Sequence, residues 1–225
     1  MTEVFTDQNV MGKEGTPFDR AKKKLQKVIS GNDAYVNTQD RADFEPYLDN
    51  QSPMTTVIMC SDSRVQAALL LNNPKGHLFT IRNIGNQVKT CEGSTDFGIY
   101  VLKTPLLLII GHTDCGAVKA VMKGYSDLAE SIKCELDTIH IGCAQNEKEA
   151  LINNINSQVE IAVEKYKELI ESNSLFVVGG IYDIQNIFGH GHGGLVFVNV
   201  NGLSSSRELG QHPLLEGLEK IKIIS

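Results

Sequence analysis

The stretch TTVIMCSDSR (55–64) begins as an apolar run and ends in three reactive side chains. Residues 55–59 are predicted to form a buried strand, because short continuous apolar runs are typical of strands covered on both faces. The run stops at Cys60, and Asp62 and Arg64 follow at alternate positions. That spacing can point both charged groups to one side of an extended turn, where they can pair. A purely structural salt bridge would explain the pair equally well.

Strand and helix patterns alternate along the rest of the chain. This βαβα order, with continuous apolar strands, predicts an α/β fold with a mostly parallel central sheet flanked by helices. Further strands are expected at 77–82, 106–110, 175–183 and 194–201, and helices at 17–30, 94–103, 117–124, 145–172 and 213–224. We expect a single domain over 1–225, with a loose leader at 1–16 and an N-terminal helical arm at 17–30 that stops at Gly31.

Composition narrows the class of protein. The 225 residues are 41% hydrophobic and 21% charged, which is typical of a globular domain. The net charge of −6 argues against a nucleic-acid partner, which would require a basic surface. The longest apolar stretch, near 105–110, is far shorter than the roughly 20 residues of a membrane helix. No membrane partner is therefore expected. Five cysteines, an odd number, favour reduced thiols and a cytoplasmic protein.

A second polar cluster, GHTDCG (111–116), follows the apolar run LLLII. In an open parallel sheet the carboxyl ends of neighbouring strands share one edge, so this cluster is expected beside Cys60. Two cysteines and one histidine form a catalytic zinc set that leaves a fourth position for water or substrate. A single buried cysteine is more often only a small hydrophobe. Taken together, Cys60, His112 and Cys115 favour a metal site.

Other candidate groups have weaker support. The sequence HIGC (140–143) repeats the histidine–cysteine spacing, but surplus metal binding there is the less favoured interpretation. GHGHGG (189–194) is so rich in glycine that a flexible loop is favoured over a metal site. Asp114, inside the second cluster, is expected to be a solvated loop charge or a helix N-cap rather than a catalytic group.

The combination of CSDSR and GHTDCG resembles the β-class carbonic anhydrases, whose C-x-D-x-R and H-x-x-C motifs are specific when they occur together. The resemblance extends from about residue 18 to about residue 202. It includes three further segments, QSP (51–53), FTIRNIGN (79–86) and GGIYDI (179–184).

The resemblance implies roles for individual residues. Zinc, one ion per chain, would be held by Cys60, His112 and Cys115, and the catalytic pair would be Asp62 and Arg64. The substrate-binding positions implied are Gln51, Phe79, Ile84, Phe97 and Gly116. Phe97 stands where plant-type members usually have a tyrosine.

The activity implied is the reversible hydration of carbon dioxide to bicarbonate and a proton, through attack by a zinc-bound hydroxide. The resemblance also implies a homodimer or a higher homo-oligomer with its pocket at the subunit interface, so that Gln51 and Phe79 would act in a neighbour's site. Asp62 would either orient the hydroxide or swing onto the zinc and replace it. The alternatives are a carbonyl sulfide or carbon disulfide hydrolase on the same scaffold and, more remotely, a non-catalytic zinc-binding protein.

Overall fold

The structure, a computed structural model, describes residues 15–224. It divides at Gln51 into two compact units, which are described separately. The predicted leader at 1–16 lies almost wholly outside the described residues. The single-domain assignment of 1–225 stays a prediction.

The first unit, residues 15–51, contains the long helix α1 (Pro17–Val36) and two single turns, η1 (Arg41–Asp43) and η2 (Glu45–Tyr47). A capping box starts α1: the Thr16 side chain accepts a hydrogen bond from the Asp19 N–H, and the Asp19 carboxylate accepts one from the Thr16 N–H. The predicted stop at Gly31 is wrong, because the helix continues to Val36. An interior glycine costs a helix only about 1 kcal/mol, which its neighbours can offset.

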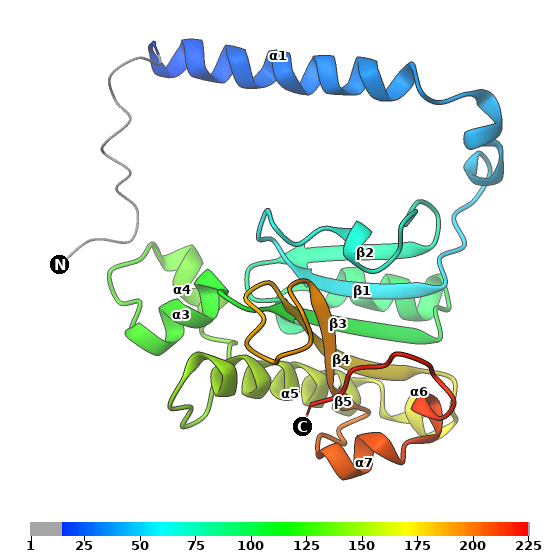
Figure 1. The fold of residues 1–225 in the computed structure, drawn as a ribbon, viewed down its shortest axis with the longest axis vertical. Coiled ribbons are helices and arrows are strands. Elements are labelled where there is room, and N and C mark those ends of the chain that lie inside the picture. The colour runs from blue at the N-terminus through cyan, green and yellow to red at the C-terminus, as the bar shows by residue number, and fades with distance from the viewer. Residues whose placement is uncertain (1–14, 225) are drawn as a thin grey trace. The chain divides into compact units, whose positions relative to one another are not determined.

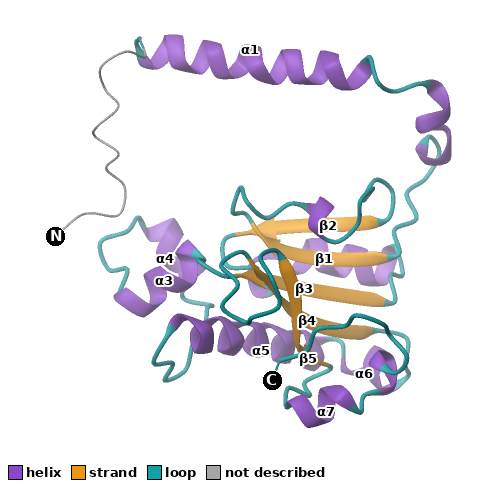
Figure 2. Ribbon diagram, in the orientation of Figure 1, coloured by secondary structure: helices purple, strands orange, loops and turns teal. Residues whose placement is uncertain are grey.

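The second unit is built on a five-stranded sheet with the order β2-β1-β3-β4-β5 (Figures 1 and 2). The pairings of β1 (Thr55–Cys60), β2 (Leu78–Asn83), β3 (Leu106–His112) and β4 (Phe176–Asp183) are parallel. Only β5 (Gly194–Val200) pairs antiparallel, with β4. The predicted mostly parallel sheet flanked by helices is therefore confirmed.

Apolar side chains cover both faces of this sheet, as the continuous apolar runs predict. Along β1, Ile58 belongs to one core cluster, and its neighbours Val57 and Met59 belong to another. All three are completely buried. Each such side chain contributes about 2 kcal/mol to the free energy of folding, so β1 is firmly anchored where it approaches Cys60.

Helices of the second unit are α2 (Glu92–Asp96), α3 (Gly116–Lys123), α4 (Glu130–Leu136), α5 (Glu147–Lys165), α6 (Lys167–Glu171) and α7 (Ser206–Gly210), with single turns η3 (Ala67–Leu69), η4 (Lys89–Cys91) and η6 (Pro213–Leu215). A π-helical turn, η5 (Phe97–Val101), extends α2. The long helix α5 packs against β3, β4 and β5. Gly179 of β4 permits this approach, because a Cβ atom there would lie 2.5 Å from Cγ2 of Ile155.

Two predicted helices differ from the structure. The helix expected at 145–172 is interrupted at Tyr166 and divides into α5 and α6. The prediction of a helix at 213–224 is wrong. Only the turn η6 forms, because Gly217 and Lys220 adopt left-handed backbone conformations that end it. Ile223 instead forms a parallel bridge with Phe197 of β5, so these apolar residues extend along the sheet edge.

Candidate metal centre

Two strand ends and a helix start bring the predicted ligands together. Cys60 is the last residue of β1 and His112 the last residue of β3. These strands are parallel neighbours, with Met59 opposite Ile110, so both residues lie at one edge of the sheet. Cys115 follows after a tight turn and is the N-cap residue of α3.

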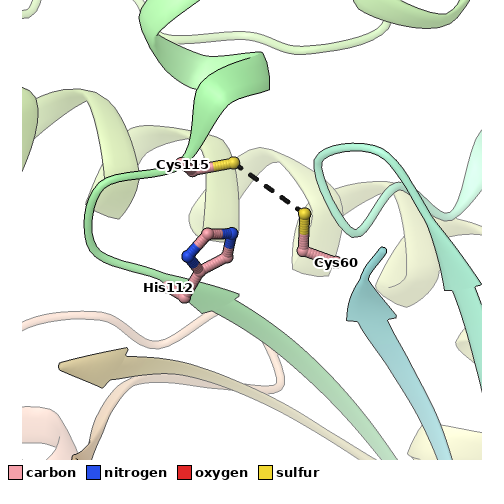
Figure 3. Close-up of side chains that lie close together, drawn as sticks. All are labelled: Cys60, His112 and Cys115. Atoms are coloured by element: carbon pink, nitrogen blue, oxygen red, sulfur yellow. Dashed lines mark hydrogen bonds between the residues drawn. The ribbon is translucent and has the colours of Figure 1, made fainter. Parts of the chain in front are cut away.

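The three side chains point toward one another (Figure 3). Their ligand atoms all lie within 4.8 Å of one another, and the two sulfur atoms are 4.0 Å apart. Cys60 is 4% exposed, His112 0% and Cys115 1%. The predicted convergence of these three residues is confirmed.

His112 is oriented to present one ring nitrogen to the cluster. Nδ1 lies 2.9 Å from the Thr113 carbonyl oxygen, so Nδ1 carries the proton and donates it. The lone pair is then on Nε2, which is buried and has no hydrogen-bond partner among the described residues. A buried polar atom left without a partner costs free energy, whereas a metal ion would use this lone pair.

The pairing of the two thiols shifts their pKa values in opposite directions. A hydrogen bond from Cys115 lowers the pKa of Cys60 to about 4, against the effect of burial. The same pairing, together with burial, raises the pKa of Cys115. A divalent cation between the sulfurs would stabilise both thiolates, and zinc favours this combination of two thiolates and one imidazole. The residues present therefore fit a zinc ion.

Asp62 and Arg64 form the predicted pair beside this cluster. Arg64 Nε donates to Asp62 Oδ1 at 2.9 Å and Arg64 Nη2 donates to Oδ2 at 2.7 Å. These hydrogen bonds hold the pKa of the Asp62 carboxyl well below its usual range, and the pair raises the pKa of Arg64. Asp62 Oδ2 lies 3.9 Å from His112 Nε2, so an ionised oxygen faces the candidate centre.

Arg82 is a supporting residue that sequence reasoning missed. Its guanidinium donates to the carbonyl oxygens of Cys60, Asp62 and Val65, at 3.0, 2.7 and 2.6 Å from Nη2. A single side chain thus ties down the loop that carries a ligand and the carboxylate. The signal was a lone charged residue within an otherwise uncharged strand, at the register position opposite Met59.

Asp114 was also misjudged. Its side chain is 31% exposed and ion-paired rather than freely solvated, and Cys115, not Asp114, holds the N-cap position of α3. Its carboxylate pairs with Arg64 and Lys119, and these partners lower its pKa, Lys119 more than Arg64. Only the turn geometry between His112 and Cys115 brings these groups together, so spacing could not reveal them.

The predicted substrate-binding residues fall into separate places. Ile84 follows Asn83, which is opposite Cys60, and so lies at the edge of the sheet that holds the centre. Phe79 is opposite Thr56, four positions before Cys60, which is about 13 Å along the strand. Its ring contacts that of Phe97, with centroids 5.9 Å apart.

The remaining predicted substrate-binding residues are Gly116 and Gln51. Gly116 is the first residue of α3, and, its own helix and chain neighbours aside, no described residue has an atom within 4 Å of where its Cβ would be. Gln51 is an exposed residue at the end of the first unit.

Fold and site together define an α/β protein with a candidate thiolate–imidazole metal centre at the carboxyl edge of a parallel sheet. The family model described as carbonic anhydrase matches residues 55–190. The chain belongs to the carbonic anhydrase family, within its β class.

Individual relatives differ in how much of their length they share with this chain. A carbonic anhydrase from Mycolicibacterium smegmatis is 37% identical over 78 residues, which cover 34% of this chain and 38% of that protein. The match thus spans well under half of that relative. One from Saccharomyces cerevisiae is 25% identical over 190 residues, covering 72% and 86%. The structure of a tetrameric β-carbonic anhydrase from Sordaria macrospora superposes with a TM-score of 0.63 at 21% identity, covering 82% of this chain and 100% of that one.

Proposed function

We propose that this protein is a zinc-dependent carbonic anhydrase that catalyses CO2 + H2O ⇌ HCO3⁻ + H⁺. The observation that carries this proposal is the buried Nε2 of His112, which has no hydrogen-bond partner within residues 15–224 and faces two thiols, with the ionised Asp62 oxygen 3.9 Å away. Three protein ligands leave one coordination position free, as in catalytic rather than structural zinc sites. That arrangement argues against a non-catalytic zinc protein.

The chain's own residues have distinct tasks in this proposal. The chemistry that zinc supplies when bound is the acidification of a water molecule. Asp62 accepts a hydrogen bond from the attacking water and so directs a lone pair of that water toward the carbon of CO2. Arg64 keeps Asp62 ionised and oriented, because it donates to both carboxylate oxygens.

The apolar residues suit a small, linear, neutral substrate. Ile84 lies at the edge that holds the candidate centre, whereas Phe79 and Phe97 pack together farther along the sheet. We propose that these two rings line the site of a neighbouring subunit, and that Gly116 leaves its backbone N–H open to substrate. Gln51 is proposed, separately, as a residue that hydrogen-bonds substrate. The tetrameric relative from Sordaria supports at least a dimer here.

Two further features complete the proposal. None of the helices in residues 15–224 is long and apolar enough to cross a membrane. All five cysteines are free thiols. Free thiols are the usual state in a reducing compartment, which supports a cytoplasmic location.

Stopped-flow measurement of CO2 hydration on protein titrated with zinc tests the function. We expect activity to rise in proportion to zinc and to saturate at one ion per chain. A parallel assay for sulfide release from carbonyl sulfide and carbon disulfide separates the alternative substrates. A zinc-loaded protein that hydrates CO2 no faster than buffer would contradict the proposal, and rapid sulfide release from the same protein would support the hydrolase instead.

A further inference from the structure

The guanidinium of Arg64 is held by two carboxylates rather than one. Besides its bonds to Asp62, Arg64 donates from Nη1 to Asp114 Oδ2 at 2.6 Å and from Nη2 to the Asp114 carbonyl oxygen at 3.0 Å. Asp62 and Asp114 bind different edges of the planar guanidinium group of Arg64. The orientation of Arg64, and with it the orientation of Asp62, therefore depends in part on a residue of the GHTDCG turn (111–116).

Asp114 is in turn fixed to two helices. Lys119 of α3 pairs with Asp114 Oδ1, and the Asp114 N–H donates to Oε1 of Glu147 at 2.6 Å. Lys119 Nζ also lies 3.5 Å from Glu147 Oε2. Charges of alternating sign thus run from Asp62 through Arg64, Asp114 and Lys119 to Glu147, the first residue of α5.

A purely local explanation of Asp114 has to be separated from this one. Its backbone φ is +63°, a left-handed conformation that aspartate, asparagine and glycine adopt more readily than other residues. The turn between His112 and Cys115 could therefore require only such a residue. Asparagine or glycine would satisfy the turn equally well, but neither would keep the carboxylate that contacts Arg64.

We propose that Asp114 is a positioning residue, anchored by Lys119 and Glu147, that locks Arg64 in the orientation that aims Asp62 at the reacting water. This inference rests on the proposed function, since it assigns Asp114 a part in the same site. Asp114 itself touches neither substrate nor metal in this role. It removes rotational freedom from Arg64 that Asp62 alone would leave.

Two variants that preserve the turn test the proposal. Asp114→Asn and Asp114→Gly are expected to lower kcat for CO2 hydration roughly ten- to hundredfold, because misdirecting a reacting group has effects of this size. The zinc content and the melting temperature should match the wild type. Asp127→Asn, an exposed loop aspartate in the same half of the chain, is the matched control and should leave kcat unchanged. Lys119→Gln should reproduce part of the loss, and Lys119→Arg should restore most of it.

A second readout does not depend on activity. In ¹⁵N-resolved NMR spectra of the purified protein, wild-type Arg64 should give separate Nη signals because its guanidinium rotates slowly, with Arg64→Lys used for assignment. Asp114→Asn should merge these signals. If wild-type protein failed to hydrate CO2, the proposed function would fall while this spectrum still decided the role of Asp114. Unchanged Arg64 signals, unchanged kcat, or a loss of kcat that follows a loss of zinc would each overturn the positioning role.

Discussion

The sulfur atoms of Cys60 and Cys115 lie 4.0 Å apart, although 55 positions separate the two residues in the sequence. They meet because β1 and β3 are parallel neighbours whose carboxyl ends share one edge of the sheet. We expect Cys60→Ala to abolish both zinc binding and activity, because two ligands hold zinc much less tightly than three. Elemental analysis of purified protein measures the zinc. Cys134→Ala is the control, since Cys134 is exposed on α4 and should keep one zinc per chain. Full activity in Cys60→Ala would remove this cluster from the mechanism.

Removing the metal should destabilise the protein. A ligand that binds only the folded state stabilises it by about 4 kcal/mol at a thousand times its dissociation constant. Chelation should therefore lower the melting temperature measured by calorimetry, and added zinc should restore it. Protein carrying Cys60→Ala should not respond to either treatment. An equal response in the two proteins would mean that zinc acts elsewhere.

The Asp62–Arg64 pair predicts a dependence of stability on pH. Because the pKa of the folded carboxyl is held well below its usual range, the pair stabilises the protein above the unfolded pKa of about 4, and this contribution is lost as the pH falls toward the folded value. Asp62→Asn should lower the free energy of unfolding by about 1 kcal/mol at pH 7. Urea titrations should show this difference shrinking below pH 4. A difference that stayed constant down to pH 3 would argue against the pairing in solution.

Arg82 should matter through the loop that it holds. Arg82→Lys keeps the charge but cannot donate to three carbonyl oxygens in a fixed plane. We expect zinc affinity to fall roughly 10- to 100-fold, as when other supporting residues of metal sites are removed. Competition with a chromophoric chelator measures this affinity. The control is Arg207→Lys on α7. Equal affinities in the two variants would show that the loop keeps its shape without Arg82.

Gly98 should be essential for packing η5 against β1. A methyl group there would overlap Oγ1 of Thr56 and reach within 3.0 Å of Cγ2 of the same residue. Gly98→Ala is expected to lower the free energy of unfolding by about 2 kcal/mol, as overpacking does in other cores. Gly93→Ala lies in the adjoining α2, where no side chain or other segment of residues 15–224 comes within 4 Å of the new Cβ, and should be neutral or slightly stabilising. Urea unfolding of both variants measures their free energies of unfolding. Equal values for the two variants would contradict the prediction.

The sequence alone was sufficient to predict the parallel sheet, the three candidate metal ligands and the pairing of Asp62 with Arg64. Continuous apolar runs specify buried parallel strands, the polar residues that end them must gather at one edge, and groups two residues apart are kept close by the chain itself. These features depend on periodicity and on covalent spacing, which are visible in a single sequence.

Only the tertiary structure decided the surroundings of these residues. Asp114 reaches Arg64 because a left-handed turn after β3 directs it there, and Arg82 reaches the loop after Cys60 from the neighbouring strand. The residues near Ile223 follow the sheet edge instead of forming a helix, because bridging to Phe197 partly buries their apolar side chains. Contacts of this kind join segments far apart in the chain. They depend on turn geometry and on competition for burial, which local sequence patterns do not encode.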